Sequence, residues 1–145
     1  MTFIGAGGYA KERARSRNWI GSQYNDNVEE PENRSGGWAS CPLTQNGFVR
    51  IVSQARYSNP IPVTRALALL QEETAATDHA FWPDDVSLTD LQRFDSERIL
   101  GPKQLMDIYL LALAVKNGGR LATLDRAIPI AAVRGAEPRH VAVIG

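Results

Sequence analysis

The feature that most constrains this chain is an apolar stretch from Leu105 to Val115 in which Asp107 is the only charged residue. Its apolar residues would cover every side of a helix, which is typical of a helix buried by packing. Gly118 and Gly119 follow and favour the end of that helix. The short run 121–124 comes directly afterwards and predicts a buried strand. A buried helix that leads straight into a buried strand is typical of an α/β protein with a parallel sheet.

The rest of the chain predicts the same alternation. Strands are expected at 38–42, 79–82, 121–124 and 140–144, and helices at 45–54, 62–73, 88–94 and about 102–117. Ser87, with Asp90 three residues later, is the N-terminal signature for the helix at 88–94. These elements predict a parallel sheet covered by helices on both faces.

The chain is expected to divide into two parts. Asn25–Ser35 is polar and has almost nothing to bury, so it is interpreted as a linker. We therefore expect an atypical, poorly ordered segment at 1–35 and one compact domain at 36–145, which suits a chain of 145 residues.

Composition excludes some classes of protein and leaves others open. No apolar run approaches the ~20 residues of a membrane span, and the single cysteine, Cys41, can form no disulfide within the chain, which fits a reducing cytoplasm. Sixteen basic and sixteen acidic residues cancel. Bases dominate at 37–70 and from 98 onward, whereas acids dominate at 71–97. If the basic stretches meet they can hold a polyanion beside an acidic centre, and the alternative is a set of solvated helix faces.

Two acids carry the strongest functional signal. A carboxylate in a buried helix, as at Asp107, is costly unless it is paired or binds a metal. Asp125 stands at the end of a predicted strand, where α/β proteins bind ligands. Two close carboxylates repel unless a cation neutralises them, and Mg²⁺ takes one or two carboxylates while keeping waters for substrate. We therefore predict that Asp107 and Asp125 bind a divalent cation, with Thr123 hydrogen-bonding a carboxylate or a phosphate oxygen.

Each acid also has a structural interpretation. Asp107 can complement the helix dipole or pair with Lys103, although a helix that begins near Pro102 would place it in the second turn, where the dipole effect fades. Asp125 can cap the turn that follows it. Asp84 and Asp85 could supply an auxiliary ligand, but a role in a turn and a cap is the favoured interpretation.

Other candidate residues give weaker signals. Gly5–Ala10 matches a dinucleotide-binding fingerprint by letters, but a polar linker stands where the rest of the βαβ unit should be. His79 and His140 are interpreted as ordinary residues at strand ends, and Cys41 as a core residue.

Three blocks, 38–50, 81–88 and 104–125, together resemble the PIN-domain ribonuclease toxins of the VapC type, from bacterial toxin–antitoxin pairs. The resemblance implies a PIN-like three-layer α/β/α fold with a parallel sheet. It also implies a Mg²⁺ (or Mn²⁺) cofactor, an RNA substrate, a cognate antitoxin protein as partner, and a possible homodimer.

The resemblance assigns site residues one by one. Asp107 and Asp125 match two metal-binding acids of the family, and Gln45 stands where a further acid, usually Glu, is found. The family's first strand carries a principal acidic ligand, and nothing in residues 1–35 matches that strand. We therefore expect the first strand to be missing or replaced, and one hypothesis is a frameshift upstream of about residue 33.

These inferences predict a Mg²⁺-dependent endoribonuclease toxin that hydrolyses phosphodiester bonds of tRNA, rRNA or mRNA in the cytoplasm, impaired by the loss of the first acid. The alternative is a catalytically inactive PIN-like domain that binds antitoxin or RNA without cleavage. A third hypothesis, a nucleotide-cofactor protein built on Gly5–Ala10, predicts binding of NAD(P) or FAD.

Overall fold

The fold is built on a five-stranded, fully parallel sheet. The computed structural model describes residues 2–4 and 37–144. The strands are β1 (Thr2–Ile4), β2 (Trp38–Ser40), β3 (His79–Phe81), β4 (Arg120–Thr123) and β5 (Val141–Val143). Their order across the sheet is β3-β2-β1-β4-β5, and each neighbouring pair is parallel. The parallel sheet predicted from the sequence is confirmed.

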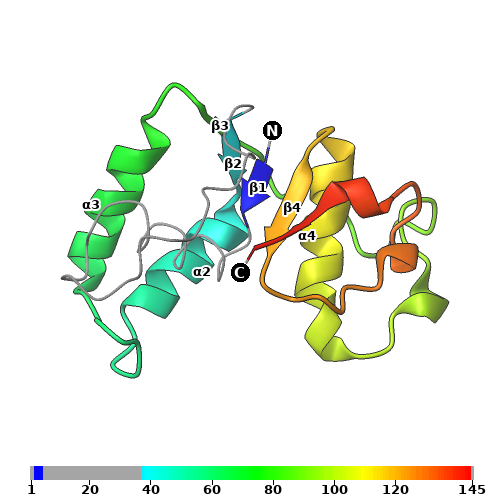
Figure 1. The fold of residues 1–145 in the computed structure, drawn as a ribbon, viewed down its shortest axis with the longest axis horizontal. Helices are drawn as coiled ribbons and strands as arrows, with labels where there is room; N and C mark the ends of the chain where they lie inside the picture. The colour runs from blue at the N-terminus through cyan, green and yellow to red at the C-terminus, as the bar shows by residue number, and fades with distance from the viewer. Residues whose placement is uncertain (1, 5–36, 145) are drawn as a thin grey trace.

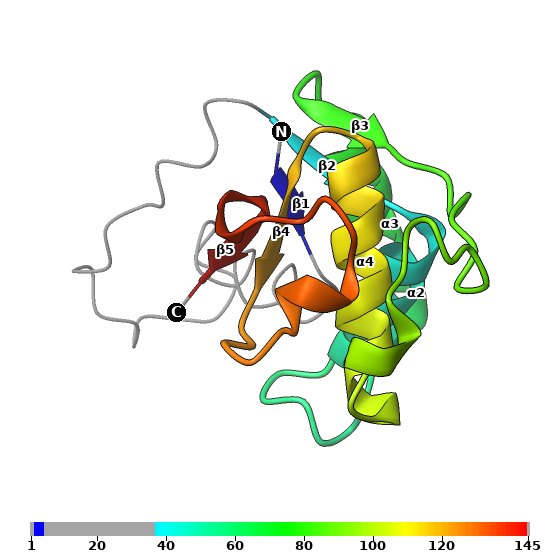
Figure 2. The same cartoon turned by 90° about the vertical axis from the view of Figure 1, so that its right-hand side faces the viewer.

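Among the described residues, three α-helices cover the sheet, and short 3₁₀ helices connect the elements. The α-helices are α2 (Pro42–Val52), α3 (Val63–Thr74) and α4 (Leu105–Lys116). The 3₁₀ helices are η2 (Ser96–Arg98), η3 (Pro102–Gln104), η4 (Ile130–Ala132) and η5 (Pro138–His140). Figure 1 shows α2 and α3 on one side of the strands and α4 on the other, and Figure 2 shows the α4 side after a quarter turn. The three-layer α/β/α arrangement is therefore confirmed.

The alternation of side chains along the strands explains the two helical layers. Successive residues of a strand point to opposite faces of the sheet. Ala39 and Leu121 belong to the hydrophobic core on the α4 side, whereas Trp38 and Ala122 pack with α2 and α3 on the other side. Between its ends α4 is almost completely buried, as its all-round apolar sequence predicts. No helix in the described part of the chain is long and apolar enough to cross a membrane.

The middle of the sheet decides between the two parts of one expectation, in favour of a strand that is replaced and not missing. The first strand of the family was expected to be missing or replaced, and the structure shows that Thr2–Ile4 takes the central position between β2 and β4. Thr2 pairs with both Trp38 and Arg120, so the sheet is continuous across β1. The strand contains no acidic residue, so the position is filled while the acid of the family is absent. The fingerprint at Gly5–Ala10 and the linker at Asn25–Ser35 lie outside the described residues.

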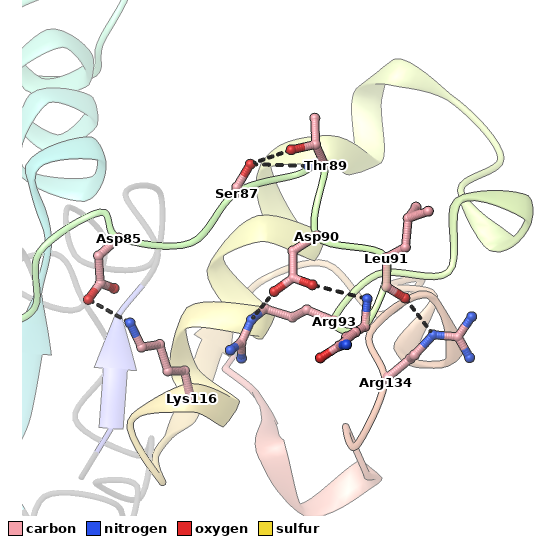
Figure 3. Close-up of polar contacts among 9 residues, drawn as sticks. Asp85, Ser87, Thr89, Asp90, Leu91, Arg93, Lys116 and Arg134 are labelled. Atoms are coloured by element: carbon pink, nitrogen blue, oxygen red, sulfur yellow. Dashed lines mark hydrogen bonds and ion pairs between the residues drawn. The ribbon is translucent and has the colours of Figure 1, made fainter.

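The prediction of a helix at 88–94 is wrong. This segment forms turns, which Figure 3 shows in the loop between β3 and η2. Asp90 uses Oδ1 to accept a hydrogen bond from the backbone N–H of Gln92 at 3.0 Å, and Ser87 Oγ lies 2.8 Å from Thr89 Oγ1. Short polar side chains that bond to nearby backbone groups compete with helix formation. The residues that gave the helix signature therefore stabilise turns.

Candidate metal centre

The two predicted acids lie at one edge of the sheet. Asp125 follows β4 by two residues, at its carboxyl end. Helix α4 is joined to the start of β4 by a short turn and packs on it, so the chain reverses and the first turn of α4 returns to the carboxyl end of β4. Asp107 is in that first turn. It is half-buried, whereas Asp125 is exposed. The edge where α/β proteins bind ligands therefore carries both acids.

Electrostatics shows that the two carboxyl groups act on each other. Burial raises the pKa of Asp107, and the negative charge of Asp125 raises it further. Both effects disfavour the ionised form of Asp107. A cation between the two groups would favour the ionised form instead, because it would offset both the lost hydration and the repulsion. The structure therefore places Asp107 and Asp125 at the same edge of the sheet, near enough for the charge of Asp125 to act on Asp107.

The structural interpretation of Asp107 changes in one respect. Helix α4 begins at Leu105, after the 3₁₀ turn Pro102–Gln104, so Asp107 stands in the first turn rather than the second. It therefore complements the helix dipole, which favours a negative charge there. The expected ion pair with Lys103 is absent from the ion pairs formed among residues 2–4 and 37–144.

Asp125 is held in place by the turn that follows β4. Its Oδ1 accepts a hydrogen bond from the backbone N–H of Ala127 at 2.8 Å, which confirms the predicted role in a turn. Thr123 is buried, and its Oγ1 accepts a hydrogen bond from the backbone N–H of Asp125 at 3.1 Å. Thr123 was expected to contact a carboxylate or a phosphate, and the bond that the structure shows instead fixes the backbone of Asp125. These two bonds orient Asp125 and leave its second oxygen, Oδ2, for a ligand.

Gln45, the fourth residue of α2, bonds to the sheet instead of to the acids. Its Nε2 donates a hydrogen bond to Ser40 Oγ at 3.0 Å, and Ser40 Oγ lies 2.8 Å from Nε2 of His79. His79 was expected to be an ordinary strand-end residue, and no signal in the sequence pointed to Ser40. The only signal that could have found this cluster is the pairing of β2 with β3, which aligns Trp38 with His79 and Ser40 with Phe81.

Asp84 takes the capping role that was favoured, whereas the side chain of Asp85 forms an ion pair that was not predicted. Asp84 Oδ2 accepts a hydrogen bond from the backbone N–H of Leu43, in the first turn of α2, at 3.1 Å. Burial and a hydrogen bond with Asp84 raise the pKa of the Cys41 thiol to about 11, so Cys41 is a protonated core residue, as expected. Asp85 forms an ion pair with Lys116 at the far end of α4, as Figure 3 shows.

The described residues fit a small, hard divalent cation in part. Within residues 2–4 and 37–144, no group of three or more His, Cys, Asp and Glu side chains could hold a metal ion. Asp107 and Asp125 nevertheless offer oxygen ligands, and a cation would offset the burial and the repulsion that raise the pKa of Asp107. One or two carboxylates with several waters suffice for Mg²⁺. The donor set is therefore suitable for Mg²⁺ or Mn²⁺.

The three layers, the parallel sheet and the paired acids at its carboxyl edge define a PIN-like domain. No family model matches the chain. Ribonuclease VapC44 of Mycobacterium tuberculosis is 44% identical to it over 133 residues, which cover 92% of this chain and 87% of that protein. Ribonuclease VapC39 of the same species is 39% identical over 103 residues, covering 70% of this chain and 73% of the relative. The chain belongs to the VapC ribonuclease family.

The match to VapC44 bears on the first residues of the chain. A match of 133 residues in a chain of 145 extends into the segment before Gly36. A change of reading frame close to residue 33 predicts no similarity upstream of that point. The extent of the match therefore argues against a frameshift there, and it leaves the lack of an acid in β1 as the departure from the pattern.

Proposed function

We propose that this chain is a Mg²⁺- or Mn²⁺-dependent endoribonuclease toxin that hydrolyses RNA phosphodiester bonds. The observation that carries the proposal is the pair Asp107 and Asp125 at the carboxyl edge of the sheet, where burial and then the charge of Asp125 raise the pKa of Asp107. The names of its relatives, ribonucleases of the VapC type, support the same reaction.

In this proposal each acid has a distinct task. Asp107 and Asp125 bind the cation, and Asp125 does so through Oδ2 because Oδ1 is bonded to Ala127. A bound divalent cation supplies an activated water for in-line attack and stabilises charge on the phosphate. Lys103 and Arg126 are exposed and lie close in sequence to the two acids, so we assign them to the phosphates of the RNA backbone.

The proposal extends to the partners expected from the family. A cognate antitoxin would inhibit the enzyme, and its docking would compete with RNA at the acidic edge. We keep the cytoplasm as the location and a homodimer as the assembly. Of the three candidate substrates, tRNA, rRNA and mRNA, the cleavage assay below tests tRNA and rRNA.

The test is cleavage of a mixture of tRNA and rRNA by the purified chain in Mn²⁺, with EDTA as a control. We expect Asp107→Asn to reduce the rate by more than about 100-fold, because even outer-shell partners of a metal contribute 10–100-fold. Asp78→Asn is the matched control, since Asp78 is exposed and directly precedes β3, at the opposite edge of the sheet. Equal rates for Asp107→Asn and the wild type, or cleavage that survives EDTA, would refute the proposal.

A second function is favoured by one specific observation. At Gln45 an uncharged amide, bonded to Ser40, replaces the acid expected in the family, and two acids alone pair at the described part of the site. On this basis the chain would be an inactive PIN-like domain that binds antitoxin or RNA without cutting it. Pull-down with the product of the adjacent gene, beside the cleavage assay, separates the two. Binding without cleavage by the folded wild type would favour the inactive domain.

A further inference from the structure

A relay of hydrogen bonds joins the side chain of Gln45 to the interior of the sheet. It runs from Gln45 Nε2 to Ser40 Oγ over 3.0 Å and from Ser40 Oγ to His79 Nε2 over 2.8 Å. The three residues come from α2, β2 and β3. Ser40 is only 3% exposed, so water has little access to its hydroxyl group and protein partners must satisfy it.

The direction of each hydrogen bond follows from the state of His79. Burial lowers the pKa of His79, so the ring is neutral near pH 7 and one of its nitrogens is an acceptor. A hydrogen bond with the backbone of Thr74 favours a proton on the ring, as a carbonyl acceptor does. Because Nε2 faces Ser40, the bond to Thr74 belongs to Nδ1–H. Nε2 therefore accepts the hydroxyl proton of Ser40.

The state of Ser40 then fixes the amide of Gln45. With its proton donated to His79, Ser40 Oγ has only lone pairs left for Gln45, so the amide must turn its NH₂ group toward Ser40. The ring of Trp38, whose centroid lies 4.3 Å from that of His79, packs against the imidazole and restricts its rotation. The carbonyl oxygen of Gln45, Oε1, is consequently directed away from Ser40.

Gln45 itself stands near the edge that carries the acids, because α2 begins just after the carboxyl end of β2. Ser40 is the last residue of β2 and Thr123 the last of β4, and only β1 separates these two strands. Two strand spacings amount to about 10 Å, which side chains and one shell of metal-bound water can span together. Gln45 extends from the helix that starts two residues after Ser40.

We propose that Ser40 and His79 are positioning residues, which orient the Gln45 amide so that Oε1 accepts a hydrogen bond from a water on the cation held by Asp107 and Asp125. This inference rests on the proposed function, because it needs the cation to bind there. It gives a role to an uncharged residue at the position where the family usually has an acid.

The relay also couples the identity of residue 45 to the tautomer of His79. A carboxylate at position 45 can only accept, so Ser40 would have to donate its proton to it. Ser40 Oγ would then need a donor on its other side, and only a proton on Nε2 of His79 supplies one. Gln45→Glu is therefore expected to move the proton on the ring toward Nε2, whereas Gln45→Met is expected to leave it on Nδ1.

The first experiment measures Mn²⁺ affinity by titration, without RNA. We expect Ser40→Ala to weaken binding by about 10–100-fold, the usual effect of losing an outer-shell partner, and Ser40→Thr to recover most of the loss. Ser53→Ala is the matched control, because Ser53 follows α2 and its buried hydroxyl has no hydrogen-bond partner in the described part of the chain. In the Gln45→Met background, Ser40→Ala is expected to have no further effect.

The second experiment reads the tautomer of His79 by ¹⁵N NMR, in the wild type and in Gln45→Glu. It remains decisive if Ser40→Ala does not fold, because Gln45 is only half-buried. A wild type with the proton on Nε2, or a tautomer unchanged in Gln45→Glu, would overturn the relay. Binding of Mn²⁺ by a folded Ser40→Ala variant within twofold of wild type would overturn the inference alone. A wild type that binds no Mn²⁺ would instead overturn the proposed function.

Discussion

The pair Asp107 and Asp125 predicts that, without a bound cation, the wild-type chain is less stable than a variant that lacks one of the two charges. Asp107→Asn removes one charge and keeps the shape of the side chain. The variant gains stability because its side chain has no charge to be desolvated or to be repelled by Asp125. Desolvation and this repulsion are the two causes of the raised pKa of Asp107. It loses the interaction of Asp107 with the helix dipole, about 0.3–1 kcal/mol. We expect a net gain of about 1 kcal/mol, within the range for relieving strain at functional sites, which corresponds to a rise in Tm of about 2–4 °C.

The sign of the pH dependence follows from the direction of the shift. Because the pKa of Asp107 is higher in the folded than in the unfolded chain, its favourable contribution to stability is complete below the unfolded pKa of about 3.9. The contribution is lost as the pH rises through the folded pKa. The advantage of Asp107→Asn should therefore be largest at neutral pH and should vanish as the pH approaches 4.

A cation should reverse the order of stability. Mn²⁺ at 100 times its Kd stabilises the wild type by about 2.7 kcal/mol, or roughly 5–10 °C, and should stabilise Asp107→Asn much less. The assay is calorimetric unfolding at pH 4.5 and 7.5, in EDTA and in Mn²⁺, with Asp78→Asn as the control. The reasoning is refuted if the wild type is the more stable protein in EDTA at pH 7.5, or if Mn²⁺ raises both Tm values equally.

Two further predictions concern the amino end of the described domain. Gly37 has φ +78°, and a Cβ there would lie 2.7 Å from the backbone oxygen of Asp78. Gly37→Ala should therefore lower the free energy of unfolding by more than the 1–2 kcal/mol of the left-handed conformation alone, measured by urea denaturation; a loss below 0.5 kcal/mol would contradict this. The Cys41 thiol is buried and has a pKa raised to about 11, so it should react with a thiol reagent at pH 8 only as the chain unfolds. Rapid labelling of the folded chain would show that Cys41 is accessible.

Elements that are recognised by a pattern of buried residues are predicted well from the sequence. Elements that are recognised by a local capping signature are predicted less well. The apolar residues of α4 form a buried helix, because packing on all sides leaves no other place for them. At 88–94 the helix signature fails although Phe94 is buried, because Leu88 and Leu91 are 46% and 68% exposed. Without burial of these leucines, the local hydrogen bonds of Ser87 and Asp90 decide the conformation.

The same contrast holds for the candidate site. Asp107 and Asp125 could be paired from the sequence, because a single short turn joins their helix to their strand. The relay through Ser40 and His79 could not, because these residues are 39 positions apart and meet only through the register of β2 with β3. Strand register depends on the assembled sheet, and no short motif in either segment encodes it.

The central position of β1 has a consequence for the motions of the domain. In the sheet, the three residues Thr2–Ile4 pair one half, made of β3 and β2, with a second half, made of β4 and β5. Both hydrophobic cores also contain residues from the two halves. Release of β1 would free the facing backbone groups of β2 and β4 in one event. Amide hydrogen exchange of these two strands should then follow a common opening free energy below that of global unfolding. Because Gln45 belongs to one half and Asp107 and Asp125 to the other, each such opening would leave their relative placement to the packing of the two cores.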